Sequence, residues 1–141
     1  MLNSNEILFK KAGVNIEFDD EGCACIWADE YMTEEVVSNY VSNALHHVSG
    51  DMIIRITTEK RDDTLRLSVF NTGAPIPEES LEHIWTKFYK VDKARTREYG
   101  GTGIGLSIVK AIMDAHHKDY GVINHEDGVE FFAEFDCSNN C

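Results

Sequence analysis

Glycine is concentrated in one part of this sequence, where four glycines fall within residues 100–105 and an apolar run at 108–113 follows them directly. Glycine tolerates positive φ and lets a ligand approach the backbone closely. A helix that begins at the end of such a loop directs unpaired N–H groups at an anion. The stretch therefore predicts a phosphate cradle, and a nucleoside triphosphate is the anion that suits it.

Two familiar glycine motifs do not fit the surroundings of this cradle. The dinucleotide fingerprint requires a hydrophobic strand before the glycines, whereas residues 90–99 are polar. A P-loop requires Gly-Lys-Ser/Thr, which is absent. A glycine turn without a ligand stays open as the alternative.

Positive charge gathers just before the glycines, in a chain whose net charge is −12. Four of the thirteen cations lie there: Lys90, Lys93, Arg95 and Arg97. Most charge runs are solvated loops, and that reading stays open. The position beside a phosphate cradle favours a role in anion binding.

Asn39, Asn43 and His47 are spaced four residues apart within a stretch of helical apolar periodicity at 29–48, with His46 beside them. This spacing places them along one strip of a helix. Asparagine is a poor residue for a helix interior, so two in register suggest a purpose. Amides that face water or bond their own backbone are the alternative. Beside a phosphate cradle, an amide oxygen is a candidate ligand for Mg²⁺.

Periodicity predicts the elements that must position these groups. Strands are expected at 14–18 and 23–27 as one hairpin, at 52–58 and 65–70 as a second, and at 120–124 and 129–135. Helices are expected at 29–48 and 104–116, with a short one at 78–83. The pattern predicts an antiparallel or mixed sheet covered by helices.

Composition bounds the class of protein. A length of 141 residues suits a single domain, and no apolar run approaches the roughly 20 residues of a membrane span. We therefore expect a soluble, intracellular chain. The acidic charge argues against nucleic-acid binding. The cysteines, spaced as Cys23-x-Cys25 and Cys137-x-x-x-Cys141, match no common zinc pattern.

Four stretches together resemble the catalytic ATP-binding domain of sensor histidine kinases, in the GHKL superfamily shared with gyrase-type topoisomerases and ninety-kilodalton heat-shock chaperones. Residues 39–44 resemble the N box, 71–75 the first glycine box, 84–89 the F box and 101–106 the second glycine box. The four boxes occur in the family's order, and the resemblance covers nearly the whole chain.

The resemblance implies an α/β sandwich with a mixed, mainly antiparallel sheet, in which ATP is held between the helices and a mobile lid at 90–100. It implies Mg²⁺ coordination by Asn43, with Asn39 beside it near the phosphates, and Lys90 among the catalytic residues. The other residues it places at the nucleotide are His46, His47, Asn71, Gly73, Ile76, Tyr89, Gly101, Thr102, Gly103, Ile104, Gly105 and Leu106.

Three positions depart from the family pattern. Asn71 replaces the aspartate that bonds the adenine amino group; an amide oxygen can accept the same bond without the charge, which would weaken adenine selectivity. Pro75 replaces the second glycine of its box. His46 and His47 stand where a lysine and an aromatic are usual, so phosphate contact there would depend on pH.

The resemblance implies a phosphotransferase that transfers the γ-phosphate to a histidine on a separate dimerisation domain, with a response regulator downstream. That domain has no room before residue 14, so we expect a monomeric, cytoplasmic fragment of a kinase anchored in the bacterial membrane. An anti-sigma-type serine kinase is the alternative. Asn39 argues against it, because the resemblance to that group implies a glutamate that acts as a general base at this position. A nucleotide-binding scaffold without catalysis is the third reading.

Overall fold

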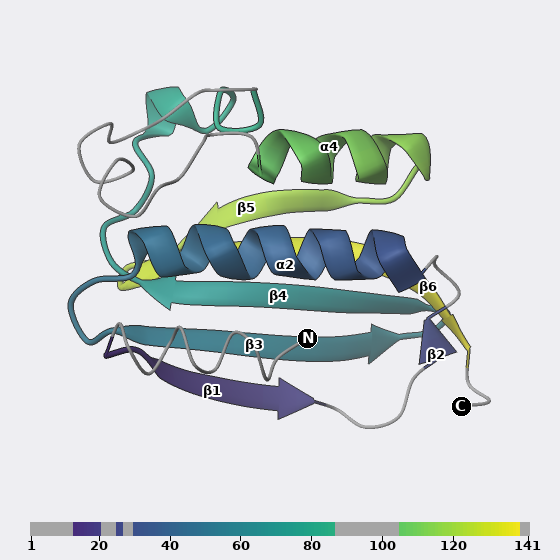
Figure 1. The fold of residues 1–141 in the computed structure, drawn as a ribbon, viewed down its shortest axis with the longest axis horizontal. Coiled ribbons are helices and arrows are strands. Elements are labelled where there is room, and N and C mark those ends of the chain that lie inside the picture. The colour runs from purple at the N-terminus through teal and green to yellow at the C-terminus, as the bar shows by residue number, and fades with distance from the viewer. Residues whose placement is uncertain (1–12, 21–24, 27–29, 87–104, 139–141) are drawn as a thin grey trace.

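The computed structural model describes residues 13–20, 25–26, 30–86 and 105–138. Its strands are β1 (Asn15–Asp20), β2 (Cys25–Ile26), β3 (Ile53–Arg61), β4 (Thr64–Thr72), β5 (Tyr120–Asn124) and β6 (Gly128–Ser138). Its helices are α2 (Glu30–His47), the short 3-10 helix η1 (Glu78–Ser80) and α4 (Gly105–Ala115). Figure 1 shows their arrangement.

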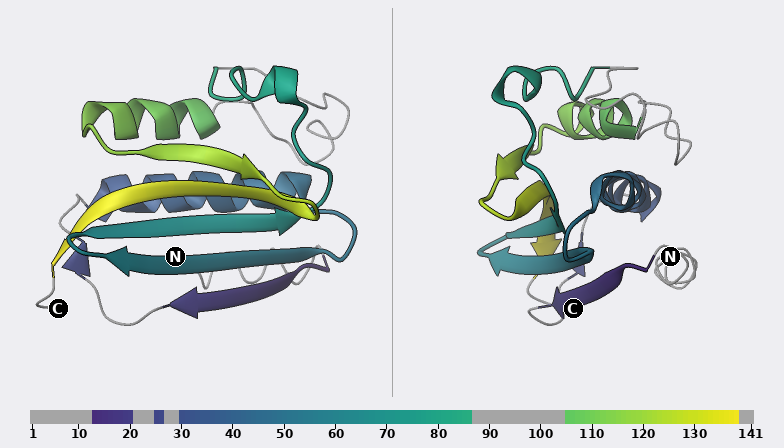
Figure 2. Two further views of the ribbon diagram at one scale, coloured as in Figure 1. Left: turned by 180° about the vertical axis from the view of Figure 1, so that it is seen from behind. Right: turned by 90° about the vertical axis from the view of Figure 1, so that its left-hand side faces the viewer.

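The strands of the described part of the chain form one six-stranded mixed sheet. Its order is β1-β3-β4-β6-β2, and β5 also pairs with β6. Only β1 and β3 are parallel among these pairs; the others are antiparallel. Figures 1 and 2 show α2 and α4 on the same face of the sheet. This confirms the predicted α/β sandwich with a mixed, mainly antiparallel sheet.

The hairpin of β3 and β4 follows the alternation of its sequence. Arg61 pairs with Thr64, which leaves a two-residue turn in which Asp62 has a φ of 55°. Aspartate tolerates this left-handed conformation better than most residues. Leu65, Leu67 and Val69 are buried, as a strand with one face against the core requires.

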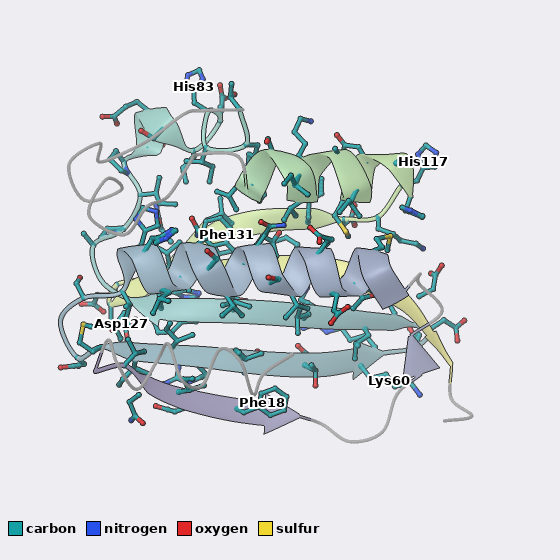
Figure 3. The ribbon with its side chains drawn as sticks, in the orientation of Figure 1. Phe18, Lys60, His83, His117, Asp127 and Phe131 are labelled. Atoms are coloured by element: carbon teal, nitrogen blue, oxygen red, sulfur yellow. The ribbon has the colours of Figure 1, made fainter. Side chains whose placement is uncertain are left out.

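The core lies between the inner face of the sheet and the two long helices. Tyr40 of α2 is fully buried, and its hydroxyl donates a hydrogen bond to the Phe132 carbonyl of β6 at 2.8 Å. The Tyr40 ring also contacts the Phe131 ring, with centroids 5.4 Å apart. Figure 3 labels Phe131 where α2 and β6 meet. Tyr40 thus ties the helix layer to the middle of the sheet.

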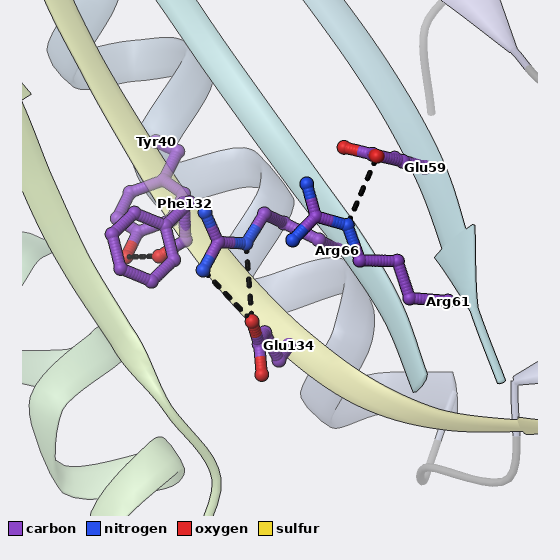
Figure 4. Close-up of polar contacts among 6 residues, drawn as sticks. All are labelled: Tyr40, Glu59, Arg61, Arg66, Phe132 and Glu134. Carbon is purple, nitrogen blue, oxygen red and sulfur yellow. Dashed lines mark hydrogen bonds and ion pairs between the residues drawn. The ribbon is translucent and has the colours of Figure 1, made fainter. Parts of the chain in front are cut away.

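Paired charges and aromatic rings occupy the opposite face of the sheet. The Arg66 guanidinium lies 4.1 Å from the centre of the Phe132 ring and donates two hydrogen bonds to Glu134, at 2.9 and 3.0 Å (Figure 4). Arg55 lies over Phe70 in the same manner, at 5.4 Å. Cations over ring faces cover apolar surface while their charge stays solvated.

The predicted first hairpin is wrong. β1 pairs in parallel with β3, Asn15 opposite Ile53, and β2 pairs with the far end of β6, Cys25 opposite Ser138. Alternation identifies a strand but does not identify its partner. The other predicted strands and the two long helices are confirmed with small changes in their ends. The short helix predicted at 78–83 is limited to η1, followed by turns.

Candidate functional site

Several chain segments that carry the candidate residues meet at one end of the molecule. The C-terminal ends of α2, β4 and β5 lie at this end, and α4 begins near it (Figure 1). The first N–H groups of α4 have no partner within the helix and, with its dipole, favour an anion. The fold therefore brings the two asparagines of α2, the end of β4 and the start of α4 into one region.

Asn39 of α2 faces the first residue of α4. Its Nδ2 donates to the Glu35 carbonyl at 2.7 Å, one turn back. Its Oδ1 lies 2.9 Å from the point where a side chain on Gly105 would begin. The absence of a Cβ at Gly105 thus lets the two helices approach here, and the Asn39 amide oxygen faces the start of α4.

Asn43 lies one turn further along α2 and is half-buried. Among the described residues, its Nδ2 is a buried side-chain atom without a hydrogen-bond partner. An unpaired buried amide is costly unless a ligand satisfies it. An unsatisfied amide donor fits a site that holds phosphate oxygens, and a carboxamide oxygen is a ligand type that Mg²⁺ accepts. His46 and His47 follow on the same helix and are half-buried.

Asn71 stands near the end of β4 and is 1% exposed. Its Nδ2 donates to the Thr72 carbonyl at 3.1 Å. This bond fixes the orientation of the amide and leaves Oδ1 as the group that can accept a hydrogen bond from a ligand. A neutral acceptor therefore occupies a nearly solvent-free position.

Thr72 fastens the strand end to the segment after α2. Its Oγ1 donates to the Ser49 carbonyl at 2.8 Å and accepts from the Ile53 amide at 3.0 Å. Its carbonyl accepts from the Ser49 amide at 2.9 Å. The loop after α2 and the end of β4 are therefore held as one unit.

Gly73 is packed where a side chain would not fit. Its φ is +147°, and a Cβ would lie 2.9 Å from Ser49 Oγ and 3.0 Å from the His47 carbonyl. Its amide donates to the Asp127 carbonyl at 3.2 Å. Figure 3 shows Asp127 at this end of the sheet. Glycine is required here by conformation and by space.

Ile76 lies in the loop after β4 and packs against the core. The Asn124 side chain holds it by two hydrogen bonds, both 2.9 Å. Leu106, in the first turn of α4, also packs against the core. Trp85 of the F box does so as well, edge-on to the rings of Tyr120 and Phe131.

The predicted contacts of the lid and the second glycine box fall outside the described residues. These are Tyr89, Lys90, Gly101, Thr102, Gly103 and Ile104. Among the others, the structure brings Asn39 to Gly105, and Gly73 to Asn71 and His47.

Sequence reasoning missed the supporting residues Ser49, Thr72 and Asn124. Asn124 did carry a signal, because it continues the inward alternation of Tyr120 and Val122 with a polar side chain. Asn71 ends the inward series of β4 in the same way. Ser49 and Thr72 carried no such signal, since their bonds depend on the tertiary fold.

Similar sequences show the family to which this chain belongs. Residues 28–138 match the family described as histidine kinase-, DNA gyrase B-, and HSP90-like ATPase. The probable sensor kinase SilS of Salmonella typhimurium is 36% identical over 102 residues, covering 72% of this chain and 20% of SilS. The sensor histidine kinase CusS of Escherichia coli O157:H7 is 34% identical over 126 residues, covering 89% of this chain and 26% of CusS. The chain thus spans about a fifth to a quarter of these relatives.

A solved structure shares the fold. The catalytic domain of the histidine kinase ThkA, in a nucleotide-free form, superposes with a TM-score of 0.79 at 32% identity, covering 93% of this chain and 84% of that one. ThkA in complex with the response regulator protein TrrA gives a TM-score of 0.76 at 30% identity, covering 93% of this chain and 36% of the matched ThkA chain. None of the helices in the described part of the chain combines the length and apolar character needed to cross a bilayer.

Proposed function

The chain belongs to the family of histidine kinase-, DNA gyrase B- and HSP90-like ATPases, and from this premise we propose that it is the ATP-binding catalytic domain of a sensor histidine kinase. The observation that carries the proposal is the position of Asn39, whose amide oxygen faces Gly105 at the start of α4. A carboxamide there can bind, but it cannot accept a proton as a base at neutral pH.

Each candidate residue that the structure describes has a proposed role in binding or orienting ATP. Oδ1 of Asn43 is the proposed Mg²⁺ ligand, and bound Mg²⁺ would offset the negative charge of the phosphates. The first N–H groups of α4, which have no partner within the helix, would face the phosphates. Oδ1 of Asn71 accepts from the amino group of adenine. Together these groups hold ATP so that the γ-phosphate can be approached in line.

The acceptor is a histidine on a separate dimerisation domain of the parent kinase. Neutral imidazole is already a nucleophile and needs no protein base, unlike water or serine. An amide at residue 39 is therefore adequate for transfer to histidine and poor for hydrolysis. The response regulator in the ThkA complex supports a response regulator as the downstream partner. We also propose that the domain is monomeric and lies on the cytoplasmic side of a parent kinase anchored in the membrane.

Phosphate release by the isolated chain, compared with transfer to an acceptor, tests this function. The acceptor is the helical hairpin domain of the parent kinase, and the control is the same hairpin with its acceptor histidine changed to alanine. We expect labelled phosphate from ATP on the intact hairpin, none on the control, and little free phosphate. Brisk release without any acceptor would contradict the proposal and favour an ATPase.

Asn39→Glu sharpens the test, because it places a base beside the phosphates. General-base help is worth roughly 10²-fold or more, so release of free phosphate should rise by up to about that factor. Asn39→Gln is the matched control, with the same length and no base. Efficient transfer to a serine-bearing protein by the unmodified chain would support the serine-kinase alternative instead.

A further inference from the structure

The loop between β4 and η1 depends on the turn between β5 and β6. Ile76 stands between Pro75 and Pro77, neither of which has an amide hydrogen. The Ile76 amide donates to Asn124 Oδ1 at 2.9 Å, and Asn124 Nδ2 donates to the Ile76 carbonyl at 2.9 Å. The side-chain amide thus imitates one rung of a β-ladder and attaches the loop to the end of β5.

A second bond from the same turn holds the beginning of the loop. The Gly73 amide donates to the Asp127 carbonyl at 3.2 Å. The turn is itself closed by a hydrogen bond from the His125 amide to the Gly128 carbonyl at 2.8 Å. Both ends of residues 73–76 are therefore fixed to one turn, by the main chain at Gly73 and by a single side chain at Ile76.

Register places Asn124 in the same row of the sheet as Asn71. Asn71 of β4 and Asn124 of β5 are both paired with Val129 of β6, one on each side. Side chains in one such row point to the same face, and strands two apart are roughly 10 Å apart. The amide that holds Ile76 and the amide proposed to bind adenine thus flank a single residue on the inner face.

We propose that Asn124 is a positioning residue for the base of the nucleotide. By holding the amide and carbonyl of Ile76, it sets the distance between the Ile76 side chain and the Asn71 acceptor, which together would form the wall against the adenine ring. The inference rests on the proposed function, because it names the part of that site which recognises the base. It predicts that Asn124 affects binding of the base and not binding of the phosphates.

Calorimetric titration with two ligands separates the two parts of the site. ATP carries base and phosphates, whereas inorganic tripolyphosphate carries phosphates alone, and both are titrated with Mg²⁺. Asn124→Ala should weaken ATP binding roughly tenfold, as the loss of two hydrogen bonds allows, and leave tripolyphosphate binding unchanged. Asn124→Asp keeps an acceptor for the Ile76 amide and loses the donor. Its ATP affinity should therefore fall between those of the wild type and Asn124→Ala. Glu126→Ala, in the same exposed turn, is the matched control and should change neither affinity.

Amide exchange gives a readout that does not depend on the nucleotide. Without ligand, the Ile76 amide should exchange slowly in the wild type and in Glu126→Ala, and rapidly in Asn124→Ala. Equal ATP affinity of the wild type and Asn124→Ala would overturn the inference, as would a parallel loss of both ligands. A wild type that binds tripolyphosphate but not ATP would overturn it too. A wild type that binds neither ligand would overturn the proposed function itself, and the inference with it.

Discussion

At the scale of single residues, the two asparagines of α2 carry the chemistry proposed for this site, and the structure holds each of them differently. Asn39 Nδ2 donates a hydrogen bond to the Glu35 carbonyl of its own helix at 2.7 Å, and Asn39 Oδ1 faces the start of α4. Asn43 keeps a buried donor unpaired among the described residues. A protein tolerates such a group when a ligand can satisfy it.

Asn43→Ala should therefore weaken ATP binding mainly in the presence of Mg²⁺. The metal loses an oxygen ligand, while contacts to the base remain. Titration of ATP with Mg²⁺ and with EDTA measures the difference, which should exceed tenfold in the wild type and nearly vanish in the variant. Ser42→Ala, on the exposed side of the same helix, is the control. Equal affinities of wild type and Asn43→Ala in Mg²⁺ would remove Asn43 from this role.

Asn71→Asp should destabilise the unliganded protein by about 1–3 kcal/mol near pH 8. Asn71 Nδ2 now donates to the Thr72 carbonyl at 3.1 Å. In the variant, an oxygen of a buried carboxylate would face that carbonyl instead. Burial would raise the pKa of the new carboxyl, so its protonated form would be favoured in the folded state. Stability should therefore recover as the pH falls below that raised pKa and decline as the pH rises through it.

Urea unfolding at pH 5.5 and pH 8 measures this effect. Asn15→Asp, on the exposed side of β1, adds the same charge at the surface and should show little of it. A variant at residue 71 as stable as the wild type at both pH values would show that the orienting bond to Thr72 is unimportant.

At the scale of elements, the joint between α2 and β4 is closely packed around Gly73. Gly73→Ala should cost about 1–3 kcal/mol of stability and also weaken ATP binding, because the strain and the clash act on the same loop. Gly50→Ala is the matched control: its φ is also positive, at +66°, but no atom lies within 4 Å of its Cβ position. A comparable loss for the two variants, measured by thermal unfolding, would show that conformation alone accounts for the requirement.

The attachment of α2 to β6 predicts a dependence on alkaline pH. Burial raises the pKa of Tyr40 well above its ordinary value of 10.0. The folded protein keeps a proton that the unfolded chain loses above about pH 10, so this contribution to stability is present below pH 10 and declines above it.

Tyr40→Phe should remove this decline and cost about 1 kcal/mol or slightly more at neutral pH, through loss of the bond to the Phe132 carbonyl. The free energy of unfolding at pH 8 and pH 10.5 gives both quantities. Tyr120→Phe, at a less deeply buried ring, should leave most of the decline in place. A decline that is unchanged in Tyr40→Phe would assign it to other groups.

Over the whole molecule, the sequence predicted the elements far better than their partners. The periodicity of residues 29–48 and 52–70 led to α2, β3 and β4, because each depends on local pattern and a short turn. It could not show that β1 lies beside β3, since a parallel pair needs a crossover and leaves no mark at the strand itself. Two contacts of the site likewise form only when distant segments pack: Asn39 beside Gly105, and the hydrogen bonds of Asn124 to Ile76.

The central place of β6 leads to a prediction for the entire chain. β6 pairs with β4 on one side and β5 on the other, and its end pairs with β2. A chain that ends at residue 127 should therefore be unfolded, with circular dichroism lacking the sheet signal. A chain that ends at residue 136 loses only the short pairing with β2 and should fold. A stable, cooperative fold in the shorter chain would contradict this view of the sheet.

The same pairing constrains how the protein can be made in the cell. β4 and β5 leave the ribosome before β6 does, so the strand edges that pair with β6 stay open while the remaining residues are synthesised. During that interval the nascent chain exposes strand edges that could pair with a neighbour. Among the described strands β6 is synthesised last, so the sheet can be completed only after β6 has left the ribosome.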